Sequence, residues 1–324
     1  MKMRWLLIPV IVLCVSFSLS PLVHAENKYP DRPITFIIPF GPGGASDLCW
    51  RVFIEDLKEA LGAPINAVNK PGAGGLKGAD FVANSKPDGY TLLAANNTCT
   101  TVAPAIDPKA YRDLVPIAVV ARQGILIATR YDHDIKTFEE MISAAKAKPE
   151  SLTVGTTGVT ASTYFDLALL ENASGTKFSH LPVPKSSEGI AMLLGGHIDF
   201  WLGTFSITQN LMKAKRVRGI ATCLPQRLST FPDIPTFAEK GYPDVNLNLV
   251  MILYAPKGTP QEVIKAWEDA LTEVMKKPHI RANLEKVNFE VDFQLGSEKI
   301  QNFLNQMRER LRMVAQEKGI KPRR

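Results

Sequence analysis

The sequence has little of what disulfide-stabilised, metal-binding or nucleic-acid-binding proteins use. Only four of its 324 residues are cysteine and five are histidine. Widely spaced cysteines in such small number exclude a disulfide scaffold and a zinc ribbon. The 38 Lys and Arg exceed the 32 Asp and Glu by six, and their longest cluster, over 213–218, is expected to cover a solvated helix end, so we expect no nucleic-acid partner. The apolar share of 45% is that of a globular protein, and the length fits about two domains.

The sequence has a single long hydrophobic run, at its N-terminus. Two basic residues precede an uncharged apolar stretch over 5–20, and Val23, His24 and Ala25 follow. This order is typical of a secretory signal peptide, so we expect cleavage after Ala25 and a periplasmic mature protein. The alternative is an uncleaved membrane anchor, which is less favoured because the run is about 16 residues and a spanning helix needs about 20.

The candidates for nucleophilic, metal or redox chemistry are few. Cys49, Cys99 and Cys223 remain in the mature chain; we expect small buried side chains, and whether any two pair is left open. No G-x-S-x-G motif is present. None of the remaining histidines forms a close pair with metal-ligand spacing, so we expect surface or hydrogen-bonded core residues at His133, His180, His197 and His279. The sequence therefore predicts no catalytic residue, no metal and no cofactor.

The mature chain alternates predicted strands and helices, which is typical of an α/β fold with largely parallel sheets. The clearest strands cover 34–39, 90–95, 116–121, 124–129, 152–155, 216–223 and 249–255. The predicted helices follow capping signals, which are Ser46 with Asp47, the pairs Thr137 with Glu140 and Thr259 with Glu262, and Ser297. Gly62 is predicted to end the first helix.

Two glycine-containing turns, over 39–47 and 155–162, share one design. Each follows a predicted strand and precedes a predicted helix. Small residues let backbone N–H groups approach a ligand, and a helix N-terminus adds unpaired donors and partial positive charge. Such turns favour anion binding without Lys or Arg. The alternative is that both are ordinary strand-to-helix turns. A third glycine cluster, over 69–75, lacks the acidic residue of a dinucleotide site.

Five ordered motifs carry a resemblance to a known family. They are the sequences KYPDRPI at 28–34, PFGPGG at 39–44, NKPGAGG at 69–75, PDGYTLL at 87–93 and PDIPT at 232–236. With these motifs the chain resembles, from about 29 to 320, the solute-binding receptors of tripartite tricarboxylate transporters, the Bug family.

The resemblance implies an α/β, two-lobed periplasmic-binding-protein (Venus flytrap) fold with two chain crossovers, near 122–125 and 246–251. After the signal peptide at 1–25, it places 26–124 and 248–324 in lobe 1 and 125–247 in lobe 2. It also implies that the two turns face each other across a cleft holding a small organic carboxylate, either a di- or tricarboxylate or an aromatic acid. The implied partners are integral-membrane transporter subunits, and we expect a monomer.

The ligand-binding residues expected from the turns and the resemblance come from both lobes. In lobe 1 they are Phe40, Gly43, Gly44, Ala45, Ser46, Asp47, Asn96, Asn97 and Thr98. In lobe 2 they are Thr156, Thr157, Gly158, Thr160, Ala161, Ser162, Tyr164, Gly203 and Thr204. The chain departs from the family at Thr160 and Ala161, where a Gly-Ser pair is common, and at Tyr164, where a His is common. No acidic residue lies within 200–204, which argues against amino-acid ligands.

The leading functional hypothesis is a non-enzymatic receptor that delivers a carboxylate to a membrane transporter. Two alternatives remain open at this point: a ligand-sensing receptor for a two-component system, and an exported hydrolase. The sequence does not identify the acid. Trp50 and Trp201 lie near predicted element ends, where each either packs in the core or stacks on a planar ligand.

Overall fold

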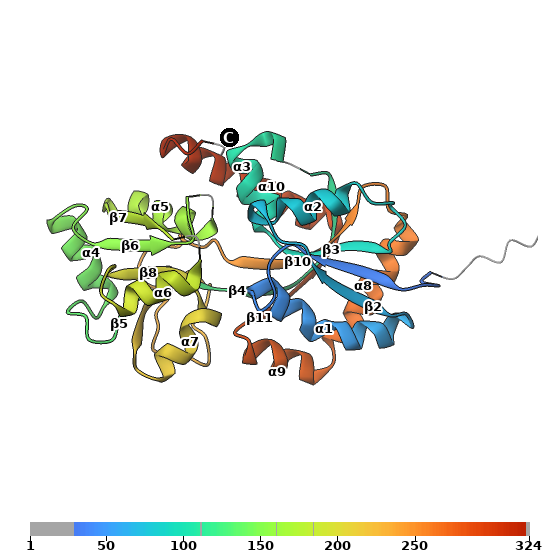
Figure 1. Ribbon diagram of the computed structural model, residues 1–324, viewed down its shortest axis with the longest axis horizontal. Helices are drawn as coiled ribbons and strands as arrows, with labels where there is room; N and C mark the ends of the chain where they lie inside the picture. Colours follow the sequence, from blue (N-terminus) through green and yellow to red (C-terminus); the bar gives the residue numbers. More distant parts are fainter. Residues whose placement is uncertain (1–28, 111, 160, 184, 322–324) are drawn as a thin grey trace, which may run out of the picture.

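The computed structural model describes residues 29–110, 112–159, 161–183 and 185–321, and the predicted signal peptide lies outside them. Two sheets flanked by helices form two lobes that lie side by side (Figure 1). The strand order of the six-stranded sheet is β11 (Glu290–Leu295), β4 (Leu114–Gln123), β10 (Leu249–Pro256), β3 (Thr91–Asn96), β1 (Ile34–Ile38) and β2 (Ile65–Asn69). That of the five-stranded sheet is β7 (Ser179–Pro182), β6 (Thr153–Thr156), β8 (Phe200–Thr204), β5 (Ile125–Arg130) and β9 (Val217–Thr222).

Ten α-helices are assigned within the described residues. Those before β6 are α1 (Ala45–Leu61), α2 (Leu76–Ala83), α3 (Ala103–Ile106) and α4 (Phe138–Ala147). Those after it are α5 (Ser162–Ser174), α6 (Ser186–Leu194), α7 (Phe205–Lys213), α8 (Gln261–Met275), α9 (Pro278–Lys286) and α10 (Ser297–Glu317). Short helical turns η1 (Ala73–Gly75), η2 (Thr98–Val102) and η3 (Pro108–Ala110) complete the set.

The expectation of largely parallel sheets is wrong. Strand β1 is parallel to β2 and β3, and β6 is parallel to β7 and β8. Strands β10 and β11 are antiparallel to their neighbours, and so is β5. The physical reason is the path of the chain: β4 leads out of the first lobe and β10 leads back into it, so the two strands pair in opposite directions.

Both faces of each sheet are covered. In the first lobe α1, α8 and α9 pack on one face, with Trp50 and Trp267 in that core. Helix α2 and the first half of α10 cover the other face. In the second lobe α4 and α5 bury one face, and α6 and α7 bury the other around Trp201. No helix of the described residues is both long and apolar enough to span a bilayer.

The chain passes between the sheets twice along its strands. Strand β4 ends at Gln123 in the six-stranded sheet, and β5 begins at Ile125 in the five-stranded one. The return passes through 246–248 into β10. Helix α10 also reaches both lobes: Ile300 and Leu304 pack in the first, whereas Leu311, Val314 and Ala315 pack in the second. Assigning 248–324 to lobe 1 alone is therefore too simple, because the end of α10 belongs to the core of lobe 2.

The helix-start predictions have mixed outcomes. The capping box of Thr137 and Glu140 is confirmed, and Gly62 ends α1 in the left-handed conformation as predicted. The other cap predictions are wrong, since no side chain caps these helices. Helix α1 begins one residue before Ser46, with Gly44 as its N-cap; α8 begins after Pro260; and Ser297 is the first residue of α10 rather than its cap.

Candidate ligand-binding site

The first turn joins β1 to α1 and presents backbone rather than side-chain donors. Gly43 has φ +73°, a left-handed conformation that favours glycine, whereas Gly44 is extended at φ −75°. The N–H groups of Ala45, Ser46 and Asp47 find no acceptor among the described residues. Because α1 continues for 17 residues, these free donors stand at the positive end of a full-length helix.

Asp47 organises the first turn from within. Its carboxylate accepts hydrogen bonds from Gly43 N (2.9 Å), Arg51 Nε (2.9 Å) and Asn69 Nδ2 (2.9 Å). Burial acts to raise the pKa of Asp47, but the hydrogen bonds from Arg51, Gly43 and Asn69 outweigh it and hold that pKa below its ordinary value. Asp47 is 3% exposed, so its carboxylate shapes the turn from inside.

Asn96, the last residue of β3, braces the same turn through Ser46 of α1. Asn96 Nδ2 donates to Ser46 Oγ (3.0 Å), and its Oδ1 accepts from Thr98 N (2.9 Å). The next residue, Asn97, directs its side chain away from the turn, to Asn248 O (3.3 Å) and Val250 N (3.1 Å) of the second crossover. The amide groups expected at a ligand are therefore used inside the protein, while Phe40 and Thr98 are half-buried beside the turn.

The second turn joins β6 to α5 and has the same character. Gly158 has φ +119°, and the N-cap residue Ala161 makes no side-chain cap bond. The N–H groups of Ser162 and Thr163 find no acceptor among the described residues, and α5 continues for 13 residues. Thr160 lies outside those residues. Both predicted anion turns thus open long helices without a side-chain cap.

The threonines of the second turn are held by neighbours that the sequence prediction did not include. Thr156 is fully buried, and its Oγ1 lies 2.8 Å from His180 Nε2 and accepts from Gly158 N (3.3 Å). Thr157 Oγ1 lies 3.0 Å from Thr163 Oγ1. These contacts fix the turn that leads into α5.

His180 is the residue that sequence reasoning missed. It lies on β7, whose parallel pairing with β6 brings it next to Thr156, and its ring centroid is 4.5 Å from that of Tyr164. Burial lowers the pKa of His180, and the nearby Glu171 opposes this shift only in part. Burial likewise raises the pKa of the Tyr164 hydroxyl. A neutral imidazole and phenol thus form an aromatic wall beside the second turn.

Gly203 and Thr204 end β8, where α7 begins. Thr204 Oγ1 lies 3.0 Å from Ser206 Oγ and is half-buried. Gly203 is glycine because a Cβ there would overlap the Trp201 indole. Trp201 and Trp50 are both fully buried in helix-covered cores, so core packing and not ligand stacking explains them.

No catalytic constellation is found among the described residues. They contain no group of three or more His, Cys, Asp or Glu that is suited to a metal ion. Cys49, Cys99 and Cys223 are free and buried, and burial raises the pKa of each thiol. His133 and His279 pair with Asp199 and Asp56.

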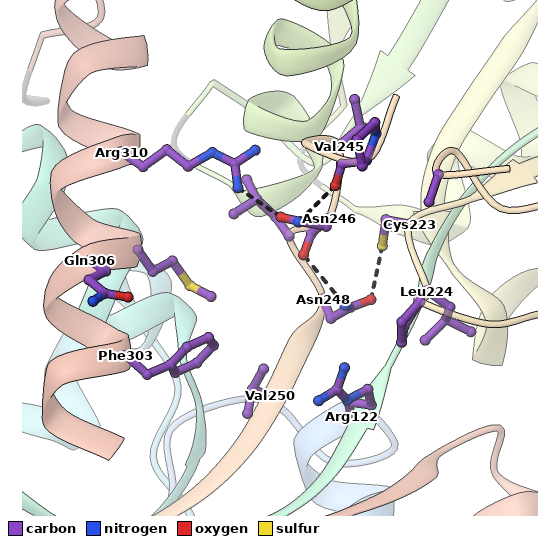
Figure 2. Close-up of a pocket in the computed structure, with 15 residues that line it drawn as sticks. Arg122, Cys223, Leu224, Val245, Asn246, Asn248, Val250, Phe303, Gln306 and Arg310 are labelled. Carbon is purple, nitrogen blue, oxygen red and sulfur yellow. Dashed lines mark hydrogen bonds between the residues drawn. The ribbon is translucent and has the colours of Figure 1, made fainter. Parts of the chain in front are cut away.

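A cavity of about 510 Å³ lies at the crossovers, between the β10 entry strand and α10. Figure 2 shows Arg122, Asn248 and Val250 on one side of it and Phe303 and Gln306 on the other. None of the predicted ligand-binding residues lines it. The two glycine turns instead lie at the carboxyl ends of β1 and β6, the parallel-strand edge at which open α/β sheets bind ligands.

Comparison with known proteins shows the family. The model of the tripartite tricarboxylate transporter family receptor matches residues 49–320. The chain belongs to this receptor family. A UPF0065 protein from the TAR-I ttuE–ttuC′ intergenic region of Agrobacterium vitis is 31% identical over 274 residues, covering 84% of this chain and 79% of that protein. The protein BugT of Bordetella pertussis is 28% identical over 281 residues, covering 85% and 86%.

Solved structures show the same two-lobed fold. A periplasmic transporter protein has a TM-score of 0.79 at 29% identity and covers 90% of this receptor and 99% of its own chain. MatC of Rhodopseudomonas palustris, solved with bound malate, has a TM-score of 0.76 at 25% identity and covers 88% and 99%. The family and the two-lobed periplasmic-binding-protein fold expected from the sequence are thus confirmed. Family and fold are those of solute-binding proteins rather than of enzymes.

Proposed function

We propose that this receptor binds a small organic carboxylate between the turns 39–47 and 156–164 and delivers it to a membrane transporter. The observation that carries the proposal is the pair of uncapped helix N-termini, one in each lobe, each preceded by a glycine with positive φ. Free N–H groups at a helix start bind carboxylates well, because each bond is charge-assisted. The malate bound in MatC supports this ligand class.

The predicted contacts are refined by the geometry. The ligand carboxylates meet the backbone of Gly43, Gly44, Ala45 and Ser46 in lobe 1 and of Gly158, Ala161 and Ser162 in lobe 2, with Thr160 retained from the sequence prediction. Phe40, Thr98, Thr157, Tyr164, Gly203 and Thr204 complete the proposed pocket, and His180 is added to them. Asp47, Asn96, Asn97 and Thr156 hold these groups in place through the internal bonds described above.

The remaining parts of the proposal concern location and partners. The signal-peptide pattern of residues 1–25 supports export with cleavage after Ala25. Intact-mass analysis of exported protein tests it: a mature chain starting at Glu26 is expected, and retention of Met1 would contradict export with cleavage. Transporter subunits as partners are supported by the family. Deletion of the gene should abolish uptake of the bound acid. If the deletion instead leaves uptake normal and abolishes the transcription that the acid induces, a sensor is favoured.

A thermal-shift screen tests the ligand class. Mono-, di- and tricarboxylates, including malate and aromatic acids, are compared with their amides on protein freed of ligand by dialysis in denaturant and refolding. A binder at 100 times its dissociation constant stabilises the protein by about 2.7 kcal/mol, and its amide should not. If no acid raises the melting temperature, or acid and amide act equally, the proposed carboxylate site is wrong.

A further inference from the structure

The two predicted ligand turns are tied to the same short piece of the second crossover. On the side of lobe 1, Asn96 donates to Ser46 of the first turn. The next residue, Asn97, donates to Asn248 O and accepts from Val250 N. On the side of lobe 2, α5 carries Asp166 one turn after its start, and Asp166 Oδ1 accepts from Leu247 N (3.0 Å). Both side chains are buried, Asn97 at 3% and Asp166 at 0% exposed.

These bonds attach one part of the second crossover to lobe 2 and the next part to lobe 1. Leu247 N is held by lobe 2, whereas Asn248 O and Val250 N are held by lobe 1. The backbone dihedrals between the two anchors are those of Leu247 and Asn248. Asn97 N also donates to Val250 O (3.0 Å), so the Asn97 residue acts as one more rung of the β3–β10 ladder.

The first crossover is divided in the same way. Gln123 pairs with Leu249 in the first sheet, and its Nε2 donates to Val287 O (3.2 Å). Ile125 N donates to Cys223 Sγ (3.0 Å) of lobe 2. Gly124 alone stands between these anchors.

Free space lies beside Leu247 and Asn248 of the second crossover. The 510 Å³ cavity is lined by Leu247 and Asn248, so this part of the strand is not packed on all sides. In Figure 2 the side chain of Asn248 bridges Cys223 and Asn246 at the edge of that cavity. A segment with room on one side can rotate without overlapping close-packed neighbours.

We infer that Asn97 and Asp166 are positioning residues that clamp the second crossover to one lobe each, so that backbone rotation along the two crossovers is confined to Leu247–Asn248 and Gly124. The inference rests on the proposed function only in that the lobes close on a ligand. Hinge motion in two-lobed proteins is absorbed by a few such backbone positions. The clamps also hold each proposed ligand turn at a fixed position relative to Leu247–Asn248. Ligand contacts in either lobe therefore shift the conformational equilibrium of this same segment.

The experiment compares variants without any ligand. Hydrogen exchange is resolved by residue with NMR, and spin labels at Glu55→Cys and Lys213→Cys report the distance between the lobes. Both positions are exposed on α1 and α7, and the native cysteines are buried. Asp166→Leu should speed exchange of the Leu247 amide at least about five-fold and leave the Val250 amide protected. Asn97→Leu should speed exchange of the Val250 amide and leave the Leu247 amide protected. Each should broaden the distance distribution.

Three variants serve as controls. Asp166→Asn keeps an oxygen acceptor for Leu247 N and should behave as wild type. Ser174→Ala removes a buried hydrogen bond to Leu170 O in the same helix but within one lobe, and should leave exchange and distances unchanged. Asp166→Ser, too short to reach Leu247, replaces Asp166→Leu if that variant does not fold.

Two results would overturn the inference: equal loss of protection at both amides in either variant, or an unchanged distance distribution in both. Failure of every acid in the thermal-shift screen would refute the proposed function and leave this result standing.

Discussion

Gly43 and Gly62 offer a matched test of the first turn. They lie at opposite ends of α1, with φ +73° and +68°, and a Cβ at either position would meet no atom within 4 Å. An alanine at either position therefore introduces the same strain and no steric overlap. Holding an L-residue in this conformation costs about 1–2 kcal/mol.

The stability effects of Gly43→Ala and Gly62→Ala should therefore be alike. Each should lower the free energy of unfolding by about 1–2 kcal/mol, or the melting temperature by roughly 2–3 °C for a protein of this size. The binding effects should differ. If the strained turn relaxes at residue 43, the amide planes of Gly44 and Ala45 turn away from the anion. Loss of one charge-assisted hydrogen bond lowers affinity by roughly ten-fold or more.

Urea unfolding and calorimetric titration with the strongest acid from the screen measure the two quantities on the same samples. Gly62→Ala should bind like wild type, because the C-terminus of α1 is remote from the proposed site. Equal loss of affinity in the two variants would mean that global strain, and not the turn, governs binding. Unchanged affinity in Gly43→Ala would remove the first turn from the site.

Three further predictions concern lobe 2, the first of them with a control substitution at Gly41 in lobe 1. Gly189→Ala should cost at least about 1–3 kcal/mol because the new methyl would overlap the Trp201 ring, whereas Gly41→Ala, with open space around it, should be near neutral in urea unfolding. Burial lowers the pKa of His180, so the unfolded chain takes up the proton first and stability falls as the pH drops through about 6.5. His180→Gln should flatten that fall between pH 7.5 and 5; an equally steep curve would contradict the assignment. Thr137→Ala should cost about 1 kcal/mol by loss of the capping box, measured in the same way, and no change would refute it.

Local features were predictable from the sequence because they depend on neighbours along the chain. The capping box at Thr137 needs only Glu140 three residues later, and Gly62 ends α1 because the left-handed conformation there favours glycine. The two glycine turns and the strands before them were found by the same local patterns. The resemblance of five ordered motifs supplied the two-lobed fold.

The tertiary structure decided the features that depend on distant partners. The antiparallel return of β10, the extension of α10 into lobe 2 and the approach of His180 to Thr156 all join residues far apart in sequence. Asn97 was expected to meet the ligand because of the family resemblance. Its amide instead donates to Asn248 O and Met307 Sδ and accepts from Val250 N, because a buried amide must find hydrogen-bond partners wherever the fold brings them. The sequence thus determines where backbone donors are left free at the start of a helix, and the packing of the lobes determines which side chains hold that backbone in place.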